Sequence, residues 1–405
     1  MSTEAGDALT NGAYPYGVNE TITPGFPYDP SQIQPPAITK TSLANVGGFF
    51  VAVDPQLKQP RSYQWNATLE QSLGKQQALS LAYVGQVGRE LLQQEFVLFP
   101  NPNIFAVQLE RNGATSDYHS LQTQFQRRMS HGLQALVSYT FSHSIDDASS
   151  GSGGSSSNGF ARGVSSNGNR GPSDFDIRHS LTMALAYELP SPGPRKSVVH
   201  KALAHWSLDN IFQVRSAPPV DVSDQSFFGV LGSAFSLVNI RPDVVPGQPL
   251  YVTQCQTIQP APAGLTACPG GRGLNPAAFQ DPPFDPNTFI PTRQGNLGRN
   301  ALSGFGASQW DFAIRREFHI HGKESTRLQF RSEFFNILNH PNFASPNNAF
   351  DGLTTFGIPP SPQFGQSTQM LGRSLSSPVA GAGGFTSIFQ IGGPRSVQFA
   401  LKLLF

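Results

Sequence analysis

The chain has 405 residues with a formal net charge of +1 at pH 7, and only 13% of its residues are charged. This low charge argues against a nucleic-acid binder that works by neutralising phosphates, and also against a charge-rich disordered chain. The 40 Gly and 34 Pro favour turns and long loops, while 31 Phe against 4 Met is the aromatic bias that strands prefer. No run of 18 apolar residues occurs, so no transmembrane helix is predicted.

Residues 1–60 are rich in Pro, Gly, Asn and Thr and show no sustained periodicity. We interpret them as an irregular loop or truncated-strand region, with one short candidate strand at Gly47–Val53. Met1–Thr10 has neither a positive n-region nor an apolar h-region, so no secretory signal peptide is visible. The second predicted domain covers residues 61–405 and carries the strong periodicity.

Apolar and polar residues alternate with the period of a β-strand along this second domain. Most of the alternating segments are about ten to fourteen residues long, which is twice the usual length of a soluble strand. A tilted membrane-crossing strand, by contrast, needs about 9–11 residues. The predicted strands cover 61–73, 79–86, 121–128, 133–142, 175–189, 206–215, 310–320, 327–338 and 396–405.

The connections between these strands alternate between short and long. The short ones are turns at Gly74, His131, Gly193 and Gly322. The long ones are a loop of nearly thirty residues around Pro100–Asn103, a Gly/Ser/Asn-rich loop at 144–174, and the loops 216–308 and 339–394. Bacterial barrels have short periplasmic turns and long external loops, so the pattern predicts an antiparallel transmembrane β-barrel with about nine or ten strands in this chain.

The segment 327–338 also fits an amphipathic helix, because several apolar residues are spaced three or four apart. Its partner across Gly322 is clearly a strand, so we favour a hairpin.

The last segment places an apolar stripe on one face of a strand, with Lys402 and Gln398 on the other face. It resembles the closing strand of bacterial outer-membrane proteins, in which the terminal aromatic residue is part of the signal for the barrel assembly machinery. The alternative is an ordinary edge strand of a soluble sandwich. The predicted assembly residues are Phe399, Leu401, Leu403 and Phe405.

Outer-membrane barrels carry aromatic girdles where the apolar band meets water. Lipid is therefore an expected partner of the apolar stripes. The candidate girdle residues are Trp65, Tyr139, Tyr187 and Trp310.

Two cysteines, Cys255 and Cys268, lie close together in the longest loop. A small loop disulfide would fit an oxidising compartment, and two unpaired thiols are the alternative. No second pair of Cys or His follows at zinc-ligand spacing.

Catalytic and cofactor motifs are missing from the sequence, so we predict no enzyme, no cofactor and no metal site. The Gly/Ser run at 151–159 lacks the Lys and the spacing of a phosphate loop. His319 and His321 share a strand face without a further ligand, and we interpret them as polar residues of the barrel interior. We interpret Asp146 and Asp147 as solvated loop acids rather than a cation site.

The hairpin at 310–338 alternates acids with basic residues, Glu317 and Glu333 with Arg315, Arg327 and Arg331. A ladder of opposite charges facing a hydrated interior explains them without acid–base catalysis. Arg residues facing lipid near the midplane would cost about 2–4 kcal/mol each.

Several stretches together resemble the barrel region of TonB-dependent outer-membrane receptors, and most closely the Oar-like group common in Acidobacteria, which carries a carboxypeptidase-regulatory-like domain. They are Tyr63–Asn66 (YQWN), Tyr118–Gln122 (YHSLQ), Ser138–Asp147 (SYTFSHSIDD), Arg170–His179 (RGPSDFDIRH), Gly295–Asn300 (GNLGRN) and Glu333–Phe343 (EFFNILNHPNF). The resemblance implies a barrel of roughly 22 strands around a plugged lumen. Nothing in the sequence resembles the plug, so we expect this chain to be the C-terminal part of something longer.

The resemblance implies capture of a small ligand by external loops and its import with energy from the inner membrane. Contact with the TonB complex would run only through the missing plug. A structural or adhesion barrel and a soluble β-rich carbohydrate-binding protein are the alternatives. An unclosed barrel has two exposed edges, so alone it should be prone to aggregate.

Overall fold

The computed structural model describes residues 49–101, 104–147, 149, 160–162, 169–191, 193–194, 197–198, 200, 204–224, 240–258, 264–285, 291–319, 326–372 and 392–404. Within these ranges, none of the helices has both the length and the apolar character needed to cross a bilayer.

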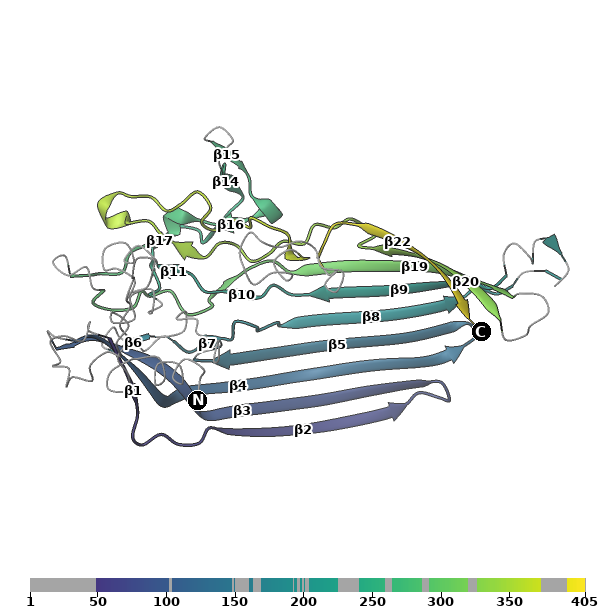
Figure 1. Ribbon diagram of the computed structural model, residues 1–405, viewed down its shortest axis with the longest axis horizontal. Coiled ribbons are helices and arrows are strands. Elements are labelled where there is room, and N and C mark those ends of the chain that lie inside the picture. The colour runs from purple at the N-terminus through teal and green to yellow at the C-terminus, as the bar shows by residue number, and fades with distance from the viewer. Residues whose placement is uncertain are drawn as a thin grey trace, which may run out of the picture.

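One large sheet dominates the structure, and its main strands lie side by side in chain order (Figure 1). Every neighbouring pair along this path is antiparallel. The strands are β2 (Arg61–Ser72), β3 (Gln77–Asn101), β4 (Ile104–Ser130), β5 (Leu133–Asp146), β8 (His179–Glu188), β9 (Trp206–Arg215), β19 (Ala307–His319), β20 (Arg327–Phe335) and β22 (Ser396–Leu404). The predicted all-β antiparallel architecture is confirmed, and the segment that also fitted a helix is strand β20.

The sheet is not closed within the described residues. Strands β2 and β22 are the two ends of its path, and no ladder joins them. Three short strands flank the path: β1 (Phe49–Val53) runs parallel to β4, β6 (Phe160–Arg162) runs parallel to β3, and β7 (Gly171–Pro172) pairs with β5.

The expected loop around Pro100–Asn103 is wrong for most of its length, because β3 and β4 continue their pairing out to Asn101 and Ile104. The alternation is interrupted near Glu90, which has a positive φ of 54°, and the register shifts between Gly88 and Leu91. A bulge of this kind reverses the face of every later side chain, so an unbroken period of two could not find the extension.

Two adjacent rows of paired residues show how the sheet separates apolar from polar side chains. Directly paired residues lie on the same face of a sheet, and successive residues lie on opposite faces. One row crosses six strands with Leu79, Phe125, Val137, Met183, Phe212 and Trp310. The next row crosses the same strands with Ser80, Gln124, Ser138, Thr182, Gln213 and Gln309.

The apolar face has no protein layer over it. Leu69, Phe399 and Leu401 are each at least 65% exposed. Apolar patches of this extent are covered by lipid or by a partner in a stable protein. The short turns between β2 and β3 and between β4 and β5 lie at one end of the sheet, which we call the turn end, and the long connections lie at the other, the loop end (Figure 1).

The two longest connections, between β9 and β19 and between β20 and β22, fold into a structured unit at the loop end, which we call the cap (the described residues of 217–305 and 342–372). Its strands form five two-stranded ladders of two or three residues per strand. They pair as β10 (Pro219–Val220) with β18 (Leu302–Ser303), β11 (Ser223–Asp224) with β21 (Ala349–Phe350), β12 (Asp243–Val244) with β17 (Phe279–Gln280), β13 (Tyr251–Val252) with β16 (Gly273–Leu274), and β14 (Gln254–Gln256) with β15 (Leu265–Ala267).

The cap has its own apolar core. Three 3-10 turns, η5 (Pro269–Gly271), η6 (Pro276–Ala278) and η7 (Thr354–Phe356), complete it. The rings of Phe279, Phe350 and Phe364 pack edge to face, with centroids 5.3–6.2 Å apart. The buried core residues are Val220, Val222, Leu274, Ala278, Phe279, Leu297, Leu302, Phe350 and Phe364.

Candidate functional site

The loop end of the sheet is joined to the cap by a buried arginine. The side chain of Arg299 is 1% exposed, and its Nη1 donates to Oδ1 of Asp146 at 2.5 Å. Its Nη2 donates to Ser149 Oγ at 2.6 Å and to Oδ1 of Asp174 at 3.2 Å. A buried guanidinium is stable only when it is paired and hydrogen-bonded, as this one is. Arg299 therefore ties the cap to the end of β5 and to the segment before β8.

The segment 169–178 is shaped to fit against this arginine. A Cβ atom added to Gly171 would lie 2.4 Å from the carbonyl oxygen of Arg299, so only glycine allows this approach. The Nδ2 of Asn300 donates to the carbonyl of Pro172 and to Oδ1 of Asp174, both at 2.7 Å.

A second buried acid, Asp176, organises the same segment. Its carboxylate accepts from the backbone N–H of Ser144 at 2.8 Å and forms an ion pair with Arg178, whose Nε lies 2.9 Å from Oδ2. His143 Nδ1 lies 3.2 Å from it. Three of the six stretches that carried the family resemblance, 138–147, 170–179 and 295–300, are thus brought together as one polar network, which we call the clamp (Asp146, Asp174, Asp176, Arg299 and Asn300).

The interpretation of Asp146 and Asp147 as solvated loop acids is wrong. Asp146 is buried and paired with Arg299. Asp147 accepts from the N–H and the hydroxyl of Thr115 at 2.8 and 2.5 Å. Asp147 is only partly buried. Arg299 and Thr115 lie 153 and 32 residues away from Asp146 and Asp147, so neither contact left a local sequence signal.

Within the cap, Asp243 and Arg293 form a two-pronged ion pair at 2.7 and 2.6 Å, and Asn296 N–H donates to the same carboxylate at 2.8 Å. Burial pushes the pKa of Asp243 upward. The hydrogen bonds from Arg293 and Asn296, together with the charge of Arg293, outweigh burial and leave the pKa below its ordinary value. The hydrogen bond to Asp243 raises the pKa of Arg293.

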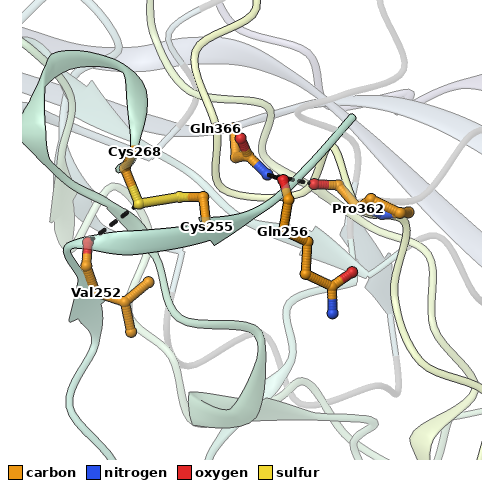
Figure 2. Close-up of a disulfide and its surroundings, with 6 residues drawn as sticks. All are labelled: Val252, Cys255, Gln256, Cys268, Pro362 and Gln366. Atoms are coloured by element: carbon orange, nitrogen blue, oxygen red, sulfur yellow. Dashed lines mark hydrogen bonds between the residues drawn. A yellow bond between two sulfur atoms is a disulfide. The ribbon is translucent and has the colours of Figure 1, made fainter. Parts of the chain in front are cut away.

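The two cysteines are joined in the structure by a disulfide between Cys255 on β14 and Cys268, just beyond β15 (Figure 2). Gln366 reaches across from the second cap segment, and its Nε2 donates to the carbonyls of Gln256 at 2.8 Å and Pro362 at 2.6 Å. The disulfide hairpin is thereby fixed to the segment 359–366.

A cavity of about 260 Å³ lies between this hairpin and the segment 359–366. Apolar and proline side chains form most of its wall, and its polar groups are carboxamides and one hydroxyl rather than charges. The polar lining residues are Gln254, Gln256, Asn275, Ser361 and Gln366. Such a mixture suits a small neutral ligand that offers hydroxyl or amide groups.

The candidate girdle residues lie on the apolar face at different heights. Trp65 and Trp310 are on the loop-end halves of β2 and β19, Tyr139 is near the middle of β5, and Tyr187 is beside the turn end of β8. Trp310 stacks on Phe212 with centroids 5.0 Å apart. Their role as a girdle stays a prediction.

The predicted assembly strand is β22, and Phe399, Leu401 and Leu403 are exposed on its apolar face. Phe405 lies outside the described residues, as does His321. The part of the chain that the structure describes holds no group of three or more His, Cys, Asp or Glu side chains placed to bind a metal ion.

The predicted ladder of opposite charges is confirmed on the polar face of β9, β19 and β20. Arg331 pairs with Glu333 at 2.7 Å, and Arg327 with Glu317 at 3.3 Å. Arg315 pairs with Asp209 at 3.3 Å. These charges lie opposite the apolar rows, where water can reach them.

An uncovered apolar face, a polar face with paired charges and a loop-end cap define a transmembrane β-barrel protein of the outer membrane. A family model described as "Outer membrane beta barrel domain" matches residues 3–376. The chain belongs to this family, and its location is the outer membrane.

Among solved structures, the chain is similar to the outer membrane transporter YddB from Escherichia coli, with 11% identity and a TM-score of 0.39 over 70% of this chain and 29% of that one. It is also similar to BauA, the ferric preacinetobactin receptor from Acinetobacter baumannii, with 9% identity and a TM-score of 0.37 over 85% and 29%. The chain is also similar to the FrpB iron transporter from Neisseria meningitidis, with 13% identity and a TM-score of 0.35 over 87% of this chain and 32% of that one. The chain spans about a third or less of the length of these proteins. No curated protein sequence matches it.

Proposed function

We propose that the chain supplies the C-terminal barrel strands of a TonB-dependent receptor of the Oar-like group, which captures a scarce nutrient and imports it with energy from the inner membrane. The observation that carries this proposal is the polar row from Ser80 to Gln309, which lies directly beside an apolar row. A sheet with lipid on one face and water on the other can line a passage for a polar solute.

Ligand capture would take place in the cap. The cavity beside the Cys255–Cys268 disulfide is held in shape by the disulfide and by the two hydrogen bonds of Gln366. Gln254 and Gln256 line this cavity and are exposed, so their carboxamides are available to a ligand. A preformed cavity costs less ordering on binding than a loop that must fold around its ligand.

Deleting the gene from the chromosome tests the transport proposal. We expect the deletion strain to lose uptake of one probe from a panel of ferric chelates, cobalamin and oligosaccharides. In the parent strain a protonophore should abolish the same uptake. The proposal fails if every probe enters the deletion strain at the parental rate.

Complementation with cap variants then locates the capture site. The double variant Gln254→Ala and Gln256→Ala should raise the probe concentration that gives half-maximal uptake by tenfold or more. Its amount at the cell surface should stay unchanged. Gln248→Ala, an exposed cap residue outside the cavity, is the matched control and should transport normally.

A structural or adhesion barrel is the second candidate. A cap with its own core and a disulfide offers a fixed surface that another cell or matrix could bind without transport. In that case the deletion strain would lose attachment to surfaces and keep all of its energy-dependent uptake.

A further inference from the structure

Three layers of side chains follow one another along the apolar face toward the loop end. On β2 the order is Leu69, Trp65, Arg61, and on β3 it includes Tyr83 and then Arg89. The register pairs Arg61 directly with Arg89, so the two guanidinium-bearing residues share the apolar face with Trp65. At about 3.3 Å per residue, Arg61 lies roughly 13 Å beyond Trp65 along the strand.

The middle layer consists of tyrosines that are hydrogen-bonded to histidines, with a tryptophan ring beside them. The hydroxyl of Tyr83 lies 2.8 Å from Nδ1 of His119, and Trp65 packs near the same imidazole. The arrangement repeats on the next strand pair, where the hydroxyl of Tyr139 lies 2.8 Å from Nδ1 of His179. Rings with one apolar end and one hydrogen-bonding end are typical of the boundary between hydrocarbon and water.

The outermost layer is a row of cations, which we call the rim (Lys58, Arg61, Arg89, Arg170 and Arg178). Each of these cations forms an ion pair with an acidic side chain that is less exposed than the cation itself. Asp117 binds both Arg89 and Arg170, Asp176 binds Arg178, and Glu90 lies between Lys58 and Arg61.

Exposure decides which charge the rim presents. Its basic side chains are 43–64% exposed, whereas the three acids beneath them are at most 29% exposed. The surface seen from outside is therefore cationic, and the three acids offset only part of the charge of the five basic residues.

We propose that the rim binds the phosphate groups of lipid headgroups in the outer leaflet of the outer membrane. Guanidinium groups match phosphate in charge and in hydrogen-bond geometry. The rim follows the aromatic layer on the apolar face, which is where headgroups lie when acyl chains cover Leu69 and its neighbours. This continuity with the lipid-covered face favours a lipid phosphate over a free one.

The inference rests on the outer-membrane location and is independent of transport, so loss of the transport proposal would leave it standing. The test titrates the full chain in mixed micelles with bisphosphorylated lipid A, and bound lipid is counted by native mass spectrometry. The same lipid A without its phosphates should bind at least tenfold more weakly. Inorganic phosphate at millimolar concentration should not displace the lipid.

Variants place the site. Arg61→Gln, Arg170→Gln and Arg178→Gln combined should weaken lipid A binding at least tenfold, and the corresponding three Lys substitutions should restore most of it because positive charge is retained. Arg327→Gln is the matched control, since this arginine is 47% exposed and paired with an acid but lies at the turn end of the polar face. Equal binding of dephosphorylated lipid A overturns the proposal, and so does full binding by the Gln variant. If that variant does not fold, the comparison of the two lipids on the unaltered chain decides.

Discussion

The sheet and the cap differ in whether their apolar side chains are buried within the protein. In the nine main strands, the buried apolar side chains among the described residues are all alanines, and Phe399 is 69% exposed. In the cap, Phe350 is 0% exposed and belongs to a cluster of nine buried residues. The sheet has strands of 9 to 27 residues and no core of its own, whereas the cap has strands of two or three residues and a closed core.

The difference shows where each part finds its stabilising environment. The sheet leaves its apolar side chains for the lipid, so its free energy of folding depends on the bilayer. The cap withdraws its apolar side chains from water by itself and adds a disulfide and buried ion pairs. Changes in the two regions should therefore respond differently to the same perturbation.

Removing the arginine of the clamp should have the largest effect. Arg299→Met leaves Asp146 buried without its cation, which typically costs about 3–5 kcal/mol. We expect faster hydrogen exchange throughout the cap, with the main strands unchanged, as measured by mass spectrometry. Arg395→Met, which replaces an exposed arginine, is the control. Parental exchange rates in Arg299→Met would show that the clamp does not hold the cap.

A charge on the apolar face should break the sheet and spare the cap. Val137→Arg places a guanidinium toward lipid, at a cost of about 2–4 kcal/mol near the midplane. Denaturant unfolding of the full chain in lipid vesicles measures this cost. Ser138→Arg, one residue along and on the polar face, should cost far less. Equal costs for the two variants would contradict the assignment of the faces.

Loss of the disulfide should loosen the cap alone. The two cysteines are 13 residues apart, and closing a loop of about this size is worth about 3 kcal/mol. Cys255→Ser with Cys268→Ser should speed proteolysis between residues 250 and 275, and reduction of the unaltered chain should match it. Unchanged proteolysis in both would mean that the cap core suffices.

Acid should produce the smallest effect. The folded-state pKa of Asp243 is lowered relative to the unfolded chain, so its ion pair stabilises the cap above the unfolded value of about 4. This stabilisation is lost as the pH falls from about 4 through the lowered pKa. Asp243→Asn should remove that part of the acid dependence, as followed by hydrogen exchange of the cap between pH 2 and 6. Asp54→Asn, which changes an acid outside the cap, is the control. It should show the same acid dependence of hydrogen exchange in the cap as the unaltered chain.

The sheet was predictable because its information is local. An unbroken period of two along β5 or β22 depends only on neighbouring residues, and it gave both the strand and its faces. The prediction failed at Glu90, where one residue with a positive φ reverses the alternation and hides the rest of β3. The segment before β8 also differs, since Phe175 and Ile177 lie in the loop rather than in the predicted strand.

The cap and the clamp were not predictable because their information is distant. Arg299 and Asp146 are separated by 153 residues, and neither position has a local pattern that shows its burial. Cap strands of two residues are too short to show any periodicity. The family resemblance marked the right stretches, but it did not show that their acids and arginines meet.

The extended hairpin of β3 and β4 determines how far this part of the chain projects from the membrane. Pairing between β2 and β3 ends at Arg89, while the ladder between β3 and β4 continues to Asn101. Twelve further residues at about 3.3 Å each give a reach of roughly 40 Å past the neighbouring strand. We therefore expect the far end of this hairpin to stand clear of the bilayer, where an antibody added to whole cells would reach it.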